Sequence, residues 1–293
     1  MVPLEKMRAM LGRGPSLAKV AEFSVGAKKL RFRERPSLMG VINLSKDSWY
    51  RESVCMSADA AIKRGIMLSA QGADIVDVGA ESTLAQAERV GSSAQKSLLL
   101  PVIRHLSRLK IPVSVETYSK AVTRASLQAG ARVLNLTGTE GSRELFRMVA
   151  DHDAAVIICH VAGKNVRQVR DLDLSGDPIP MLYEFFGRQI ELASRCGVRK
   201  IFLDPGLGFY YRNLQDSAVR VRHQMEVFLN SHRLRVLGHP ICNALPHAFE
   251  YFEEEVRCAE PFFAVLAALG GTDLFRTHEV RRVQSVLKTL QAF

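Results

Sequence analysis

The stretch QGADIVDVG, residues 71–79, decides the fold class of this chain. It joins a glycine at the end of an expected helix directly to a run rich in β-branched residues. A glycine there is typical of a helix C-terminus, and the run is typical of a buried strand. The same junction recurs at AGAR (129–132) and CGVR (196–199), and each is followed at once by another apolar run. Three copies of one helix-to-strand junction indicate repeated βα units.

Apolar runs of this kind occur eight times after residue 37. They are nearly continuous rather than alternating, which is typical of parallel strands covered on both faces. The runs are LMGVIN (38–43), DIVDVG (74–79), PVSVET (112–117), RVLNLT (132–137), AAVIICH (154–160), KIFLD (200–204), RVLGHPIC (235–242) and DLFRTH (273–278). Helical spacing between them is clearest over 57–71, 119–130, 143–151, 181–196, 214–230 and 259–270.

Eight βα units in 293 residues predict one domain, a closed (β/α)₈ TIM barrel spanning residues 1–293. The alternative is a doubly wound open sheet, which would carry a glycine-rich fingerprint after its first strand. The segment NLSKDS (43–48) has no such glycine. We expect residues 16–37 to form a short extended pair that plugs the barrel floor, and residues 1–15 to be a loose leader.

Composition narrows the function classes. The hydrophobic content of 47% excludes a disordered chain, and no apolar run approaches the roughly 20 residues that cross a membrane. The net charge of +10 is concentrated in residues 1–35, without the interleaved aromatics or reading motif of a nucleic-acid-binding protein. Five widely spaced cysteines form no C-x-x-C pair, which indicates reduced thiols. We therefore expect a cytoplasmic protein that binds a small molecule, with no nucleic-acid or membrane partner.

Polar residues stand where the predicted strands end. In a barrel these positions face a shared pocket, although each residue alone fits a helix cap or core position equally well. The strand ends are Asn43, the segment 79–82, Glu116, Asn135, His160, Asp204, Asn243 and His278. Glu116, Asn135 and Asp204 combine acceptors with donors, as the amino-pyrimidinone edge of a flat heterocycle requires.

Several motifs carry a family resemblance. MGVINLSKDSW, GADIVDVGAEST, VSVETYSKAVTRASLQAGARVLN, KIFLDPGLGF and FRTHEV resemble, in order and spacing from about residue 22 to residue 290, the motifs of dihydropteroate synthase. The resemblance implies a barrel that holds a reduced pterin in its mouth. It implies that Glu116, Asn135 and Asp204 bind the pterin ring, and we add His160, because related enzymes keep a histidine at that place.

The resemblance also implies an anion site. Asn43 would lie near a pyrophosphate and its Mg²⁺ ion, which makes Asn43 the expected metal ligand. Arg276 and His278 would contact the anion from the eighth strand. We therefore expect Asn43, Arg276 and His278 to be the catalytic residues.

The chain departs from the family at the rim of the pocket. The family's seventh strand ends in Ser-Arg-Lys, whereas this chain has NALPH at 243–247, and the loops at 45–53 and 84–86 also differ. These losses would remove cationic stabilisation of a departing pyrophosphate. We expect little activity with 4-aminobenzoate, unless Lys46, Arg51 or His247 has taken over the cationic role.

Three functions follow from these observations. The first is a transferase of folate-type biosynthesis that joins a pterin-methyl pyrophosphate to an amine. The second is methyl transfer from a methyl-tetrahydropterin, because related methyltransferases place an asparagine at the end of strand seven, where this chain has Asn243 as a pterin contact. The third is a non-catalytic barrel that binds a pterin or stabilises a partner. The apolar segment 261–271 suggests a homodimer, or a heteromer with a paralogous barrel.

Overall fold

The computed structural model describes most of the chain beyond its N-terminal segment. The described residues are 18–45, 47, 50, 53–82, 87–209 and 211–292. The predicted leader at 1–15 lies outside them, as do Lys46 and Arg51. No helix among the described residues has the length and apolar character needed to span a membrane.

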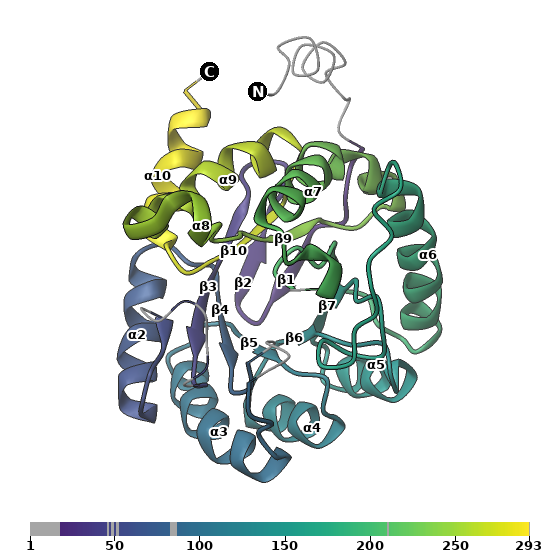
Figure 1. Ribbon diagram of the computed structural model, residues 1–293. Helices are drawn as coiled ribbons and strands as arrows, with labels where there is room; N and C mark the ends of the chain where they lie inside the picture. The colour runs from purple at the N-terminus through teal and green to yellow at the C-terminus, as the bar shows by residue number, and fades with distance from the viewer. Residues whose placement is uncertain are drawn as a thin grey trace.

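Eight parallel strands form the centre of the molecule (Figure 1). In chain order they are β3 (Ser37–Asn43), β4 (Ile75–Gly79), β5 (Val113–Glu116), β6 (Val133–Leu136), β7 (Ala155–Cys159), β8 (Ile201–Asp204), β9 (Cys242–Ala244) and β10 (Leu274–Thr277). Each strand except β8 forms a ladder with the next, and β10 returns to β3 with Leu274 opposite Ser37. A parallel bridge between Leu203 and Ile241 joins β8 to β9. The ring is therefore closed, which confirms the predicted (β/α)₈ barrel.

Helices surround the strands and connect them (Figure 1). They are α2 (Ala58–Ala70), α3 (Ser92–Arg108), α4 (Lys120–Ala129), α5 (Ser142–Asp151), α6 (Ile179–Arg195), α7 (Ser217–Asn230), α8 (Phe249–Phe252), α9 (Ala259–Leu269) and α10 (Val280–Leu290), with 3₁₀ segments η2 (Arg212–Leu214), η3 (Ser231–Leu237) and η4 (Glu253–Cys258). The predicted junction glycines Gly72, Gly130 and Gly197 have φ values of +105°, +114° and +88°. These left-handed conformations favour glycine and confirm why the helices end there.

A small hairpin closes the bottom of the barrel. Its strands β1 (Phe23–Val25) and β2 (Lys28–Leu30) are antiparallel. Val25 and Leu30 are buried in one apolar cluster with residues near the starts of the barrel strands. The ring of Phe23 meets Phe202 of β8 edge-on, with 5.0 Å between ring centroids. The predicted extended pair is therefore present and plugs the barrel at the N-terminal ends of its strands.

A buried ion pair lies among the connections. Arg235 of η3 and Asp273, just before β10, are 6% and 3% exposed. Arg235 Nη1 lies 2.5 Å from Asp273 Oδ1, and the backbone N–H of Ile241 donates to Asp273 Oδ2 at 2.8 Å. This pair links η3 to the N-terminal ends of both β9 and β10.

Candidate active site

The carboxyl ends of the strands surround one cavity. Its wall includes a residue at or just beyond the end of every barrel strand. These are Asn43 (β3), Glu81 (after β4), Glu116 (β5), Asn135 (β6), Cys159 (β7), Asp204 (β8), Ala244 (β9) and Arg276 (β10). His278 adds a further polar group. The structure thus brings together six of the predicted site residues: Asn43, Glu116, Asn135, Asp204, Arg276 and His278.

Two predicted residues do not line this cavity. Side chains alternate along a strand, so the inward positions of Cys242 and Ala244 turn Asn243 outward. Asn243 Nδ2 donates to Thr272 Oγ1 at 2.6 Å, and the residue is 0% exposed. His160 faces α6, where its ring meets Phe185 edge-on, and it lines a separate small cavity. These placements correct the expectation that every polar strand end faces one pocket.

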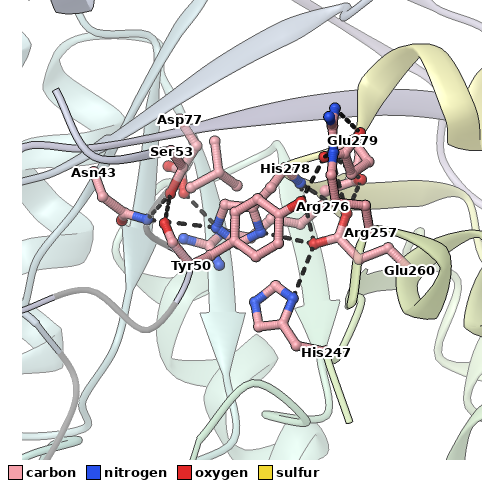
Figure 2. Close-up of polar contacts among 12 residues, drawn as sticks. Asn43, Tyr50, Ser53, Asp77, His247, Arg257, Glu260, Arg276, His278 and Glu279 are labelled. Atoms are coloured by element: carbon pink, nitrogen blue, oxygen red, sulfur yellow. Dashed lines mark hydrogen bonds and ion pairs between the residues drawn. The ribbon is translucent and has the colours of Figure 1, made fainter. Parts of the chain in front are cut away.

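The floor of the cavity is held by one arginine (Figure 2). Arg276 Nε lies 2.8 Å from Asp77 Oδ2. Its Nη2 pairs with Glu116 Oε2. Asn135 Nδ2 also donates to Asp77 Oδ2, at 3.1 Å. Asp77 was not singled out in the sequence analysis, although a carboxylate in the apolar run DIVDVG was a visible signal. Its position in β4 makes it the link between the arginine and the asparagine.

Burial dominates the ionisation of the floor. It raises the pKa of Asp204 to about 6, although the backbone N–H of Gly206 donates to Oδ1 at 2.7 Å and opposes the rise. Burial raises the pKa of Glu116 to about 7; Arg276 opposes this rise, and Asp77 and Asp204 add to it. A single guanidinium therefore serves three closely placed carboxyl groups.

A second group of contacts lies at the rim (Figure 2). Glu260 of α9 is 0% exposed, and its Oε1 accepts from His278 Nδ1 at 2.7 Å. The ring of Tyr50 stacks on both His278 and His247, with centroid distances of 4.7 and 4.8 Å. Glu260 was missed by sequence reasoning, because it precedes the strongly apolar segment 261–271. Its pairing with a strand-end histidine depends on helix packing.

The cavity wall is poor in cations. Among the residues that the structure describes, Arg276 is the only lysine or arginine on the wall. The end of β9 supplies Ala244, Leu245, Pro246 and His247 instead. Burial lowers the pKa of His247 to about 3, so its ring is neutral near pH 7. In this structure, His247 therefore does not replace a lysine as a cation.

Comparison with known proteins identifies the family. The family described as "Pterin binding enzyme" matches residues 39–278. The chain belongs to the pterin-binding enzyme family. Among curated members, it is similar to the dihydropteroate synthase of Synechocystis sp., with 29% identity over 92% of this chain and 93% of the relative. The Bacillus subtilis dihydropteroate synthase is 27% identical over 90% of each chain.

Solved structures agree with this assignment. A Xanthomonas albilineans dihydropteroate synthase with 4-aminobenzoic acid has a TM-score of 0.77 and 26% identity, covering 94% of this chain and 98% of that one. A Thermus thermophilus dihydropteroate synthase in complex with 4-aminobenzoate has a TM-score of 0.75 and 25% identity, covering 93% and 100%. This pterin-binding enzyme is thus dihydropteroate synthase-like, and enzymes of that name are transferases of folate biosynthesis.

Asn43, the expected magnesium ligand, has a side-chain oxygen that could bind the ion. Asn43 Nδ2 donates to Ser53 Oγ at 2.6 Å and lies 3.5 Å from His278 Nε2. Both contacts use the amide nitrogen, which leaves the amide oxygen for a cation. Mg²⁺ commonly takes few protein oxygens and completes its shell with water and substrate phosphates. The single Asn43 oxygen fits that mode of binding.

Proposed function

We propose that this chain joins a pterin-methyl pyrophosphate to an amine, in the manner of a dihydropteroate synthase, and that it works poorly with 4-aminobenzoate. One observation carries the proposal. Glu116, Asn135 and Asp204 meet at one desolvated floor beside Arg276, whereas the rest of the described wall has no lysine or arginine. The groups that would bind the pterin ring are thus separate from those that would stabilise the anion. Only the anion-stabilising groups are fewer here than in the family.

The floor suits the amino-pyrimidinone edge of a pterin. Asp204 accepts hydrogen bonds from the ring's N–H groups when it is ionised, and Asn135 offers both a donor and an acceptor. Both residues are nearly inaccessible to water, at 3% and 2% exposure. A ligand that left one of its own polar groups unpaired there would lose about 1–3 kcal/mol. This penalty selects a heterocycle with matching donors and acceptors.

The reaction breaks the bond between the pterin methylene and the pyrophosphate oxygen and forms a bond from that carbon to the amine nitrogen. Pyrophosphate leaves with its electron pair, and the amine loses a proton. Asn43, Arg276 and His278 are the groups we place against the anion. Asp77 and Glu116 already compensate the charge of Arg276, so its stabilisation of the leaving group is weakened. Such stabilisation is commonly worth several kcal/mol.

Magnesium is part of this proposal. Asn43 would hold the ion through its amide oxygen, together with oxygens of the pyrophosphate. When bound, Mg²⁺ neutralises charge on the leaving group. Chelation should therefore reduce pyrophosphate release, and added Mg²⁺ should restore it.

The test is pyrophosphate release from 6-hydroxymethyl-7,8-dihydropterin pyrophosphate with a panel of arylamines that includes 4-aminobenzoate. We expect release with at least one amine and little release with 4-aminobenzoate. Asp204→Ala should weaken pterin affinity at least tenfold in calorimetry, since a buried acceptor is lost. Asp153→Ala is the matched control, because this carboxylate is 67% exposed and pairs with Lys200 outside the site.

The other functions make different predictions. Methyl transfer was also suggested by Asn243, and the outward turn of that side chain removes this part of its support; transfer of a methyl group to a cobalamin protein would distinguish it. A non-catalytic role predicts tight pterin binding with no turnover on any amine. A host deleted for its own synthase can be made to express this chain and grown in medium without folate end-products. Robust growth would contradict weak activity with 4-aminobenzoate.

A homodimer is part of the proposal, although segment 261–271 supports it only in part. Phe263, Ala264 and Ala267 are 0% exposed and form the inner face of α9, while Phe262 and Leu269 are 45% and 43% exposed. The dimer surface would therefore use these two outward residues. Light scattering of the full chain should give a dimer mass, and Phe262→Glu should shift it toward the monomer.

A further inference from the structure

His247, Glu260 and His278 form a compact group beside the cavity (Figure 2). They come from three elements: the segment after β9, helix α9, and the residue after β10. One possible ligand atom from each lies within 4.8 Å of the other two. His247 and His278 line the cavity, and Glu260 lies behind them. None of the functions described above requires His247 and Glu260 to be together.

Glu260 is a buried carboxylate without a permanent cation. In the described part of the chain its ion-pair partners are the imidazoles of His247 and His278, and no lysine or arginine pairs with it. Thr277 Oγ1 and the backbone N–H groups of His278 and Glu279 donate to Oε2, the two backbone groups at 2.9 and 3.1 Å, so Oε1 is the oxygen that faces the two imidazoles. A cation beside Oε1 would compensate the carboxylate when it is charged.

His247 has an orphaned atom directed into the group. Its Nδ1 is buried, has no hydrogen-bond partner among the residues that the structure describes, and lies 3.5 Å from Glu260 Oε1. Glu260 Oε1 is in turn 2.7 Å from His278 Nδ1. Bonds of about 2.0–2.1 Å to a tetrahedral ion place ligand atoms roughly 3.3 Å apart. The observed separations lie on either side of that value, so small side-chain rotations would accommodate an ion that replaces the proton His278 Nδ1 now donates to Glu260.

We infer that His247, Glu260 and His278 bind one Zn²⁺ ion. Two imidazoles and one carboxylate are a common zinc ligand set, and three protein ligands leave one position open for water or substrate. This site is distinct from the magnesium position, which uses the oxygen of Asn43 and substrate phosphates. Zinc is preferred over magnesium here because imidazole nitrogens suit a borderline-soft ion.

The ion would compensate for the shortage of cations at the rim. His247 stands in the segment 243–247, where the family's Ser-Arg-Lys is absent, and His278 is a proposed anion contact. A divalent charge held there would attract the pyrophosphate of the substrate. This role rests on the proposed function, whereas the zinc site itself does not.

The test uses the full chain after chelator treatment and dialysis. Zinc affinity is measured by competition with a chromophoric chelator, and Co²⁺ is added separately as a spectroscopic probe. We expect one equivalent of zinc and visible cobalt bands without the near-ultraviolet band of cobalt–thiolate bonds. His247→Ala and Glu260→Gln should each weaken zinc binding at least tenfold. His152→Ala is the matched control, because this histidine follows α5, away from the site, and its Nδ1 lies 2.8 Å from Met148 O.

The outcomes are separable. Unchanged zinc affinity in both site variants, or a thiolate band with cobalt, would overturn the zinc site. If Glu260→Gln does not fold, His247→Ala still tests the site, since His247 packs at the rim. Thermal denaturation without zinc checks that both variants are folded. Inorganic pyrophosphate should bind the zinc-loaded chain at least tenfold more tightly than the stripped chain. Zinc binding without pyrophosphate release from the pterin substrate would contradict the proposed function alone. Pyrophosphate release by a chain that binds no zinc would contradict the zinc site alone.

Discussion

At the scale of single residues, the floor of the cavity holds ionisable groups under strong desolvation. Asp204 is 3% exposed and has a pKa of about 6, well above the ordinary aspartate value of 3.8. The folded protein therefore keeps a proton on Asp204 at pH values where the unfolded chain has lost it. By linkage, the contribution of this group to the free energy of unfolding falls as pH rises from about 4 to about 6.

We expect Asp204→Asn to stabilise the protein while weakening pterin binding. The substitution removes the cost of ionising a buried acid, and the Oδ1 contact with the Gly206 N–H can remain. Above pH 7 the gain should be about 1–3 kcal/mol, and it should become small near pH 3.5, where the folded state is protonated and the unfolded state is largely protonated. Urea denaturation at the two pH values measures it; an equal effect at both would contradict the linkage.

Residue types predicted part of this site, and side-chain direction explains the rest. Glu116, Asn135 and Asp204 were found because polar residues at strand ends face a barrel mouth. Asn243 was misplaced because a single-residue change of register turns a side chain to the other face. Glu260 could not be found, because its contact with His278 depends on how α9 packs.

At the scale of elements, the buried pair of Arg235 and Asp273 fixes η3 against the starts of two strands. Arg235 also donates to the carbonyl oxygen of Gly271 at 3.0 Å. Its neighbour in the same 3₁₀ segment, Arg233, forms an ion pair with Asp177 in which both side chains are at least 40% exposed. The two arginines offer a direct comparison of a buried pair with an exposed one.

We expect Arg235→Met to lower the free energy of unfolding by about 3–5 kcal/mol, because it leaves Asp273 charged, buried and unpaired. Arg233→Met should change it by less than about 1 kcal/mol, since exposed pairs contribute little. Urea denaturation of both variants measures the difference. Similar losses in the two proteins would show that the Asp273 carboxylate is satisfied by other donors.

Element boundaries show which parts of the fold were predictable. The junction glycines marked the ends of α2, α4 and α6, because a left-handed residue after a helix is a local requirement. Helix α3 was not among the segments with the clearest helical spacing, and its internal Pro101 is an unfavourable helix residue. Packing of α3 against the barrel outweighs that local preference.

At the scale of the whole molecule, the barrel has one weak seam. Seven neighbouring pairs of strands form regular ladders, whereas β8 and β9 are joined by the isolated bridge between Leu203 and Ile241. The N–H of Leu203 donates to the Pro240 oxygen at 3.0 Å across this seam. Local opening is favoured where few hydrogen bonds must break.

We expect peptides that span β9 to exchange their amide hydrogens faster than peptides that span β6, which has a ladder on both sides. The difference should be about tenfold or more, since one or two fewer hydrogen bonds correspond to roughly 1.4 kcal/mol of opening free energy. Hydrogen–deuterium exchange with mass spectrometry measures it. Equal rates would show that side-chain packing closes the barrel as firmly there as elsewhere.

The crowded carboxyl groups beneath Arg276 also affect the heat measured when a ligand binds. Near pH 7, Glu116 is partly protonated, because burial raises its pKa to about 7. A pterin presents N–H donors to this floor and therefore favours the ionised acids, so binding should expel a fraction of a proton into solution. The apparent enthalpy would then vary with the ionisation heat of the buffer, and Tris and phosphate would give different values for the same complex. Glu116→Gln should make the apparent enthalpy nearly independent of the buffer, because the group that releases the proton is gone. Calorimetry in several buffers therefore measures how many protons the cavity floor releases when a ligand binds.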